Sequence, residues 1–426
     1  MLTAARTGAA VLSALLLAGA GAAPALADSP SPTATVAVPA GLYGQGDPTY
    51  DGVWRQSLAL AALAGVHAVP ADSAVGWLTG QQCADGGWPS FRPDTAVPCD
   101  APTEDSNATA VAVQALAALG GHQDAVDKGV AWLKANQNAD GSWAYNPGSP
   151  GDANSTGLTV TALLAAKADP ATVAKAGRSG YDGLALFQLG CASPAEQRGA
   201  FAYQPDPAGA LAANALASSQ AALAAAGGRL PVVNTNQVDA AAKALACTAG
   251  AAAQPVARAD SAEAAAAYLA GQLAAGDQHL MLTLPGATPT PDYTATAWAA
   301  LSLIQSGHAK QAVGAVDWLA AQGGTWTKGG TDASATATLV LVAQAAQRDP
   351  AAFGGTNLLQ QLTAAGPALK SAPASPAATA AAKDDKGGVS TLWVIGVGLL
   401  IGIGGGLLLS LQRRRGNRDA AGKPGR

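Results

Sequence analysis

The sequence has little of the charge that a protein needs to bind nucleic acid. Only 12% of its 426 residues are charged. Outside the first 27 and the last 15 residues, 17 Lys and Arg stand against 27 Asp and Glu, a net charge of −10. Nucleic acids and other anionic polymers bind through basic surfaces, so this surplus of acid argues against either as the partner.

Cysteine is also scarce, and its spacing argues against a metal site. The four cysteines are Cys83, Cys99, Cys191 and Cys247, and no two stand two to four residues apart, as most zinc sites require. An even number of cysteines in an exported chain indicates two disulfides. Of the three possible pairings we expect Cys83–Cys99 and Cys191–Cys247, because each joins nearest neighbours in the sequence. We expect no metal and no cofactor.

The two ends of the chain resemble targeting and anchoring segments. Residues 1–27 combine Arg6, an apolar run and a small-residue cleavage pattern, which predicts a secretory signal peptide. Residues 389–411 are uncharged and long enough to cross a bilayer, and the basic tail 412–426 follows them. The sequence therefore predicts a single-pass cell-membrane protein with a cytoplasmic C-terminus. Residues 28–41 are expected to be disordered, and the Pro- and Ala-rich residues 366–388 to form a stalk.

Strand-like alternation is missing from the middle of the chain, residues 42–365. Ala- and Leu-rich segments alternate there with Gly, Pro and Asp turns, which predicts an all-α domain. The segments form two alternating series. The series rich in small residues is 51–66, 105–119, 152–167, 207–226, 292–306 and 332–347. The other series is 72–82, 124–137, 171–189, 236–248, 260–274 and 310–322, with 356–364 closing the end. We expect an α/α toroid of about six inner and six outer helices, the outer ones carrying Trp77, Trp132, Tyr268 and Trp318.

A short motif recurs between these segments. Residues 82–88 read Q-C-A-D-G-G-W, residues 137–143 read Q-N-A-D-G-S-W, and residues 321–326, A-Q-G-G-T-W, are an eroded third copy. These turns, with the D-x-x-[ST]-[AG] helices after them, resemble the prenyltransferase and squalene oxidase repeats of the terpenoid cyclase and protein prenyltransferase superfamily. That superfamily folds as an α/α toroid. The resemblance implies structural roles for the repeat positions, which are Gln82, Trp88, Gln137, Trp143, Gln322 and Trp326.

The chemistry of the catalytic branches of that superfamily is absent from the sequence. In place of the D-x-D-D of alkene-protonating cyclases stands Thr103-Glu104-Asp105-Ser106, where Asp105 is better explained as a helix N-cap. None of the four histidines lies near a cysteine, so a zinc triad is not indicated. The residues of a thioester, Cys191 and Gln197, are six apart instead of three. The chain is similar to a non-catalytic member, such as the toroid domain of cobalamin carriers, although it lacks their β-rich second domain.

Aromatic residues are few, and several lie in the turns before the inner helices, where they would meet at one mouth of the toroid. Such rings either bind a ligand or plug the central hole. Asn107, Asn154 and Asn214 near the helix starts either donate to a ligand or cap helices. The candidate ligand-binding residues are Tyr50, Trp54, Phe91, Asn107, Tyr145, Asn154, Tyr203, Tyr293 and Trp298.

The sequence thus predicts a membrane-tethered extracellular toroid that binds a ligand or a partner protein without catalysis. An accessory for uptake of a hydrophobic or corrinoid-like molecule is one such role. The alternatives are an enzyme of the cyclase or prenyltransferase type and a structural cell-surface interaction protein. The sequence does not identify the ligand.

Overall fold

The computed structural model describes residues 37–248, 255–283 and 286–371, all of which belong to one compact unit. The predicted signal peptide, the membrane helix 389–411, the tail 412–426 and most of the stalk lie outside the described residues. None of the helices in the described part of the chain could cross a bilayer.

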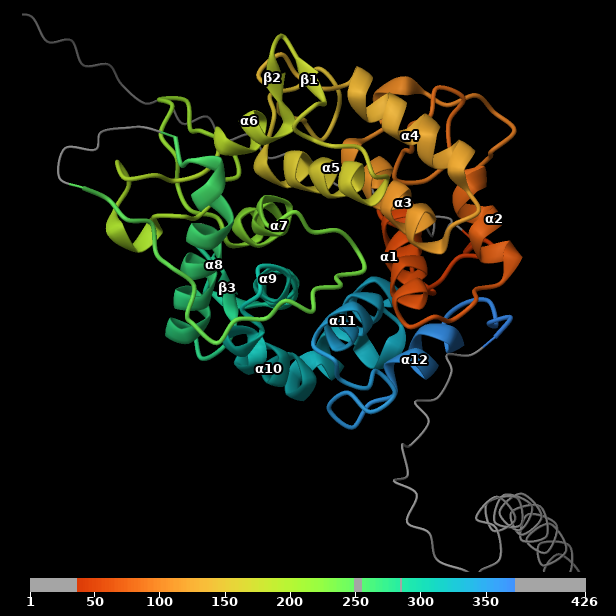
Figure 1. The fold of residues 1–426 in the computed structure, drawn as a ribbon. Helices are drawn as coiled ribbons and strands as arrows, with labels where there is room; N and C mark the ends of the chain where they lie inside the picture. The colour runs from red at the N-terminus through yellow and green to blue at the C-terminus, as the bar shows by residue number, and fades with distance from the viewer. Residues whose placement is uncertain (1–36, 249–254, 284–285, 372–426) are drawn as a thin grey trace, which may run out of the picture. The chain divides into compact units, whose positions relative to one another are not determined.

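Six helices form a closed inner ring (Figure 1). Each packs on the next, and α11 packs on α1 to complete the circle. Most residues in these helices are buried, and their Ala, Thr and Ser side chains allow the helices to approach closely. The inner helices are α1 (Gly52–Gly65), α3 (Ser106–Leu119), α5 (Ala153–Ala165), α7 (Ala215–Ala225), α9 (Tyr293–Gln305) and α11 (Ala333–Ala345).

Six outer helices surround this ring, and each packs against the inner helix that precedes it in the chain. They are α2 (Asp72–Gly80), α4 (Gln123–Ala135), α6 (Gly180–Ala185), α8 (Arg258–Ala275), α10 (Ala309–Thr327) and α12 (Leu358–Ala364). The described residues therefore form the helix-rich, two-ring arrangement that the sequence predicts. The aromatic side chains Trp77, Trp132, Tyr268 and Trp318 all lie on the outer helices and contact the core.

Asp and Asn side chains begin five of the inner helices. Asp105, Asp152, Asn214, Asp292 and Asp332 each accept a hydrogen bond from the backbone N–H three residues later, at 2.6 to 3.0 Å. These N-caps satisfy backbone donors that the helix itself leaves free. Asp105 is thus a cap, as predicted.

The repeat glutamines join consecutive outer helices. The Gln137 side-chain N–H donates to the carbonyl oxygens of Gly141 and Val173, at 3.0 and 3.3 Å. Gln82 makes the same two kinds of bond, to Gly86 in its own turn and Ala125 in α4. Each turn is thereby fixed against the start of the next outer segment.

The repeat tryptophans fill the space between the rings. Trp88 and Trp143 are fully buried. Their ring N–H groups donate to the carbonyls of Leu78 and Leu133 at the ends of the preceding outer helices. Their backbone N–H groups donate to Thr109 and Thr156 of the following inner helices, both at 2.9 Å.

The third turn expected from the sequence, at residues 321–326, does not form. Helix α10 continues through it to Thr327, Gln322 is exposed, and Trp326 stacks on Tyr293 at 5.8 Å between ring centroids. This segment lacks the Asp that closes the other turns: Asp140 Oδ1 accepts from the backbone N–H of Ser142 at 3.0 Å. Without that side chain the backbone stays helical.

A third copy of the repeat is present elsewhere, with an insertion. The Gln188 side chain donates to the carbonyls of Gly199 and Ser261, and the backbone N–H of Phe201 donates to Ser218 at 2.9 Å. Phe201 thus takes the place of the repeat tryptophan. This turn is seven residues longer than the other two, which hides the copy from a search at fixed spacing.

Helix is absent from residues 236–248, contrary to the sequence prediction. We call residues 227–248 the strap, which follows α7 and has no regular secondary structure. Its backbone is held by other side chains: Ala242 N–H donates to Gln311 and Lys243 N–H to Glu263, both at 2.8 Å. These tertiary bonds replace the helical ones. The inner segment 207–226 is likewise shorter than expected, since α7 begins only at Ala215.

The strap also covers the C-terminal end of the inner ring. Leu230 and Val232 are buried, and the backbone N–H of Leu230 donates to Gln114 of α3 at 2.9 Å. Asn234 donates to the Gln305 carbonyl at the end of α9, at 2.6 Å. One end of the toroid is therefore closed.

Two small antiparallel hairpins interrupt the helices, although the sequence predicts an all-α domain. One pairs β1 (Ala174–Lys175) with β2 (Arg178–Ser179), and the other pairs β3 (Leu280–Leu282) with β4 (Thr290–Asp292). Both disulfides form as expected, Cys83–Cys99 and Cys191–Cys247. The second disulfide fixes the end of the strap to the enlarged third turn.

Candidate functional site

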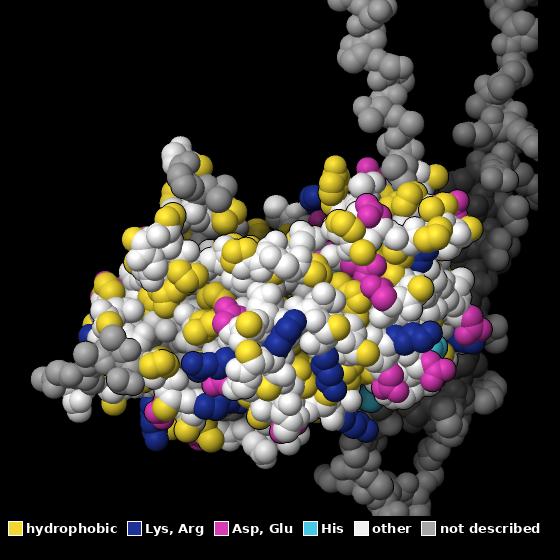
Figure 2. All heavy atoms as spheres, turned by 90° about the horizontal axis from the view of Figure 1, so that it is seen from above, with side chains coloured by type: hydrophobic (Ala, Val, Ile, Leu, Met, Phe, Trp, Pro, Cys, Tyr) yellow, Lys and Arg dark blue, Asp and Glu magenta, His cyan; other side chains and the backbone are white. Residues whose placement is uncertain are grey.

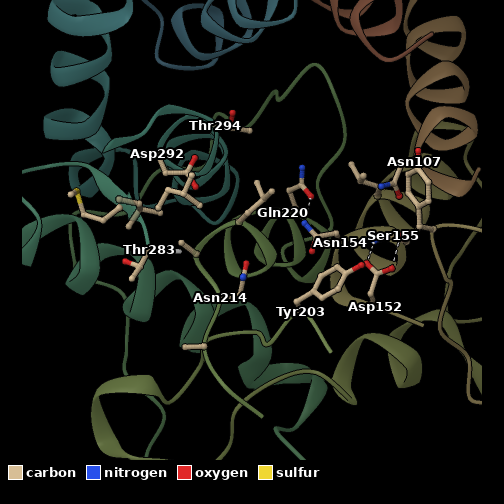
Figure 3. Close-up of a pocket in the computed structure, with 18 of the residues that line it drawn as sticks. Asn107, Asp152, Asn154, Ser155, Tyr203, Asn214, Gln220, Thr283, Asp292 and Thr294 are labelled. Carbon is tan, nitrogen blue, oxygen red and sulfur yellow. Dashed lines mark hydrogen bonds between the residues drawn. The ribbon is translucent and has the colours of Figure 1, made fainter. Parts of the chain in front are cut away.

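A cavity of about 920 Å³ lies at the end of the inner ring where the helices begin. Residues at the starts of α1, α3, α5, α7 and α9 line it, together with the first strand of the second hairpin. The N-termini of these helices therefore point to one mouth. Figure 3 shows this cavity, with Asn154, Tyr203 and Gln220 on its wall. On the face of the domain in Figure 2, acidic and basic side chains are interspersed with apolar ones.

Tyrosines reach the cavity from an equivalent position in two repeats. Tyr145 and Tyr203 each stand two residues after the repeat aromatic, and their side chains are 43% and 46% exposed. Their backbone carbonyls accept from the first N–H of the preceding inner helix, from Ser106 at 2.9 Å and Ala153 at 3.0 Å. The repeat thus both anchors the loop and presents the ring.

Two carboxylates at the mouth, Asp105 and Asp152, serve as helix caps and are shielded from water. Burial raises the pKa of Asp105 to about 6, although hydrogen bonds from Ala108 and Ser90 oppose the shift. Burial also raises the pKa of Asp152, against the bonds from Ser155. Both oxygens of each carboxylate already accept hydrogen bonds. Each carboxylate therefore already helps to hold the start of its helix.

Side-chain amides form a second polar feature of the wall. Asn154 Nδ2 donates to Gln220 Oε1 at 2.7 Å, joining α5 to α7, and both side chains are buried. Asn107 occupies the corresponding second position of α3, and its Oδ1 is buried without a hydrogen-bond partner among the described residues.

Six of the nine residues predicted to bind a ligand line this cavity. They are Tyr50, Trp54, Asn107, Tyr145, Asn154 and Tyr203. The structure places three others elsewhere. Phe91 stacks on Trp77 of α2 at 6.4 Å, and Tyr293 packs on Trp318 and Trp326 of α10. Trp298 is 1% exposed and belongs to the core.

Two of these residues, Tyr293 and Trp298, lie in the inner helix α9, whereas Phe91 lies in the loop after the first repeat turn. A residue near the start of an inner helix points either into the cavity or away from it, depending on its angular position on the helix. Tyr293 faces α10, and Trp298 is buried in the core, so neither reaches the mouth.

Several residues that line the cavity were not predicted. Those at helix N-caps could have been, because the N-cap pattern is visible in the sequence. Asp51, Asp152 and Asp292 line the cavity because parallel helices place their N-caps at one mouth. Gln220, Tyr268 and His279 also line it, but no sequence pattern distinguishes them.

The charge of the wall limits the ligands that it suits. Among the described residues that line the cavity, none is Lys or Arg. The cavity therefore lacks the cations that usually bind diphosphate or carboxylate groups. The nearest buried cation, Arg55, is paired with Asp51 at 2.8 Å.

One group of possible metal ligands occurs in the described residues, and it does not suit a metal ion. Cys83, Cys99 and Glu104 lie together, but the two sulfurs are bonded to each other. A disulfide has no thiolate to offer a metal.

Comparison with known proteins supports the resemblance seen in the repeats. Residues 43–161 match the family model of the squalene-hopene cyclase C-terminal domain, in the terpenoid cyclase and prenyltransferase superfamily. A search of curated proteins returns no match. A solved structure, described as that of a protein from Actinoplanes, aligns with 16% identity over 73% of this chain and 95% of its own, with a TM-score of 0.43.

Proposed function

From a domain whose first repeats match the squalene-hopene cyclase family, we propose a protein that binds a small organic ligand and does not transform it. The ligand is neutral or cationic and occupies the cavity at the mouth of the inner ring. A membrane-tethered accessory for uptake of a hydrophobic or corrinoid-like molecule fits this role and the anchoring segments that the sequence predicts.

The observation that carries the proposal is the composition of the cavity wall. Aromatic rings offer apolar contact, amides offer hydrogen bonds, and the lining residues that the structure describes include no Lys or Arg. Small-molecule sites typically combine a mainly apolar surface with a few polar groups in a cavity of roughly 300–1,000 Å³. The acidic caps favour a neutral or cationic ligand over an anion.

The hydrogen bonds of the cavity carboxylates support binding without catalysis. General acid or base catalysis needs a carboxyl group free to exchange a proton with the substrate. Asp105 and Asp152 instead have one oxygen in a capping bond and the other in a hydrogen bond from a serine hydroxyl. Moving either carboxylate toward a substrate would break the cap of an inner helix.

Native mass spectrometry of the full-length protein in detergent tests the proposal. Cyanocobalamin, a polyprenol and a neutral oligosaccharide would be offered in turn. We expect one of them to be retained at one copy per chain, unchanged in mass, and to be lost from the Tyr145→Ala and Tyr203→Ala variants. Leu186→Ala, which alters an exposed side chain outside the cavity lining, is the matched control. Retention of none would contradict the proposal and favour a structural interaction role.

A cyclase-type enzyme is the second candidate, and one observation favours it. Asp105 lines the cavity and has a pKa raised to about 6, as a general acid near neutral pH requires. Incubation with polyprenyl substrates separates the two functions. Product formation that disappears in Asp105→Asn would establish the enzyme and overturn the binding proposal.

A further inference from the structure

We propose that the paired amides of Asn154 and Gln220 bind a ligand group that carries a hydrogen-bond donor and an acceptor side by side, such as a carboxamide or a lactam. The inference rests on the proposed function, because it names the ligand chemistry that the same cavity would recognise.

The two amides are placed on the wall by adjacent inner helices. Asn154 is the second residue of α5 and Gln220 the sixth of α7, and both line the cavity (Figure 3). Their side chains are only 9% and 5% exposed. Long polar side chains buried to this degree normally have all their polar atoms bonded.

The hydrogen bond between the two amides leaves part of their hydrogen-bonding capacity unused. Each amide has one carbonyl and one NH₂ group, and the 2.7 Å bond uses one of each. Whichever side chain donates, one free carbonyl and one free NH₂ remain. Neither Asn154 Oδ1 nor Gln220 Nε2 bonds to another residue in the described part of the chain.

Asn107 extends this arrangement to a third helix. It lies at the second position of α3, as Asn154 does in α5, and it also lines the cavity. Its Oδ1 is buried and accepts no hydrogen bond from the described residues. The wall therefore offers unpaired amide groups on α3 and on the α5–α7 pair.

Only some chemical groups complement both a free acceptor and a free donor. A carboxylate would present acceptors alone, and it would lie near the buried carboxylates of Asp105 and Asp152. An ammonium group would present donors alone. A carboxamide or lactam presents one N–H and one C=O from the same edge, so it satisfies both partners without burying a charge.

Three small ring compounds test this inference on the full-length protein in detergent. They are 2-piperidone, its N-methyl derivative, which lacks the N–H, and cyclohexanone, which lacks the nitrogen. Dissociation constants would be measured by ligand-observed NMR. We expect 2-piperidone to bind about tenfold more tightly than the other two, since a site built to pair an N–H discriminates against an analogue without it.

Variants assign the preference to the amide pair. We expect the double variant Asn154→Leu/Gln220→Met to reduce the preference to about one, because neither amide then remains to pair with the N–H. Gln220→Glu alone removes the donor that pairs with the C=O of all three probes, so it should weaken all three and keep the preference. Gln322→Glu, the same substitution at an exposed glutamine of α10, should leave all three affinities unchanged. Circular dichroism would show which variants are folded, and Gln220→Glu serves if the double variant is not.

The possible results separate this inference from the proposed function. Equal binding of the three probes to the unmodified protein would overturn the amide inference and leave the cavity as a binding site. A preference that survives in the Asn154→Leu/Gln220→Met variant, or affinities for all three probes that Gln220→Glu leaves unchanged, would also overturn it. Binding of none of the probes, at any concentration up to their solubility, would overturn the amide inference too, whereas the proposed function fails only if the protein retains none of the larger ligands named above.

Discussion

Two neighbouring carboxyl groups, Glu104 and Asp105, show how differently single residues are used around the first repeat turn. Asp105 faces the cavity and caps α3. Glu104 turns the other way, is 2% exposed, and lies beneath the turn, where a Cβ on Gly87 would come within 2.0 Å of its Oε2. Glu104 Oε2 has no hydrogen-bond partner among the described residues. Burying the Glu104 carboxyl group therefore costs more free energy when the group is ionised than when it is protonated.

The stability of the domain should depend on the ionisation of Glu104. Burial, and then the nearby Asp85 carboxylate, raise the pKa of Glu104 from 4.5 to about 7. Because the folded state holds the proton more tightly, the stabilisation is complete below pH 4.5 and is lost as pH rises to about 7. We expect Glu104→Gln to be more stable than the unmodified protein at pH 8 by on the order of 3 kcal/mol.

Chemical denaturation at pH 4, 6 and 8 measures this effect. The unfolding free energy of Glu104→Gln should still depend on pH, but less strongly, because burial also raises the pKa of Asp105. Adding Asp105→Asn should remove most of what remains. An unchanged pH dependence in Glu104→Gln would show that Glu104 does not titrate in this range.

At the scale of the elements, the repeat turn is the unit that connects the two rings. Its glutamine, aromatic residue and glycine each make a contact that recurs. A Cβ on Gly86 would lie 2.3 Å from the Lys128 carbonyl oxygen, and one on Gly141 would lie 2.3 Å from that of Ser179. Both glycines have positive φ, so they combine a backbone conformation and a close approach that other residues disfavour.

Replacing the buried repeat glutamine should destabilise the domain. Gln137→Ala leaves the carbonyls of Gly141 and Val173 without their side-chain donor, at a cost of about 1–3 kcal/mol. Gln322→Ala, in the segment that stays helical, should change the unfolding free energy by less than about 0.5 kcal/mol. Denaturant unfolding of both variants makes the comparison. Equal losses would contradict the difference between a formed and an unformed turn.

The glycine of the second turn should be more sensitive than a glycine with similar φ elsewhere. Gly141 and Gly148 have φ of 89° and 83°, but a Cβ on Gly148 would meet no atom within 4 Å. Gly148→Ala should cost about 1–2 kcal/mol for the left-handed backbone alone. Gly141→Ala adds a clash with backbone and should cost more than about 4 kcal/mol. Thermal unfolding would show the order, and similar melting temperatures would refute the predicted contact.

The sequence could predict these turns because their geometry is local. The Asp that closes the turn, the Gly with positive φ and the following helix cap all act within about ten residues. The third copy was misassigned for the same reason. Residues 321–326 keep the Gln and Trp letters but lack the Asp, whereas Gln188 and Phe201 keep the contacts at a longer spacing.

At the scale of the whole domain, the strap and its disulfide close one end of the toroid and leave the other as the site. Cys191 and Cys247 are 56 residues apart and enclose α7, whereas Cys83 and Cys99 are 16 apart. A crosslink stabilises chiefly by restricting the unfolded chain, and the effect increases with the length of the loop.

Removing the two disulfides should therefore have unequal effects. We expect the double variant Cys191→Ser/Cys247→Ser to lose about 4 kcal/mol of unfolding free energy and Cys83→Ser/Cys99→Ser about 3 kcal/mol. Denaturation under oxidising conditions gives both values against the unmodified protein. A larger loss from the shorter loop would point to native-state contacts around Glu104 instead of loop length.

The sequence by itself determined the helix-rich two-ring fold, the caps, two repeat turns and both disulfide pairs. These follow from local turn chemistry and from the periodicity of buried small residues. Only the tertiary structure decided which side chains meet in the cavity. Tyr293 turns toward α10, Trp298 is buried in the core, Gln220 reaches Asn154 from 66 residues away, and the strap forms no helix because distant side chains hold its backbone. Such contacts depend on how the helices are rotated and packed against each other, which no local pattern encodes.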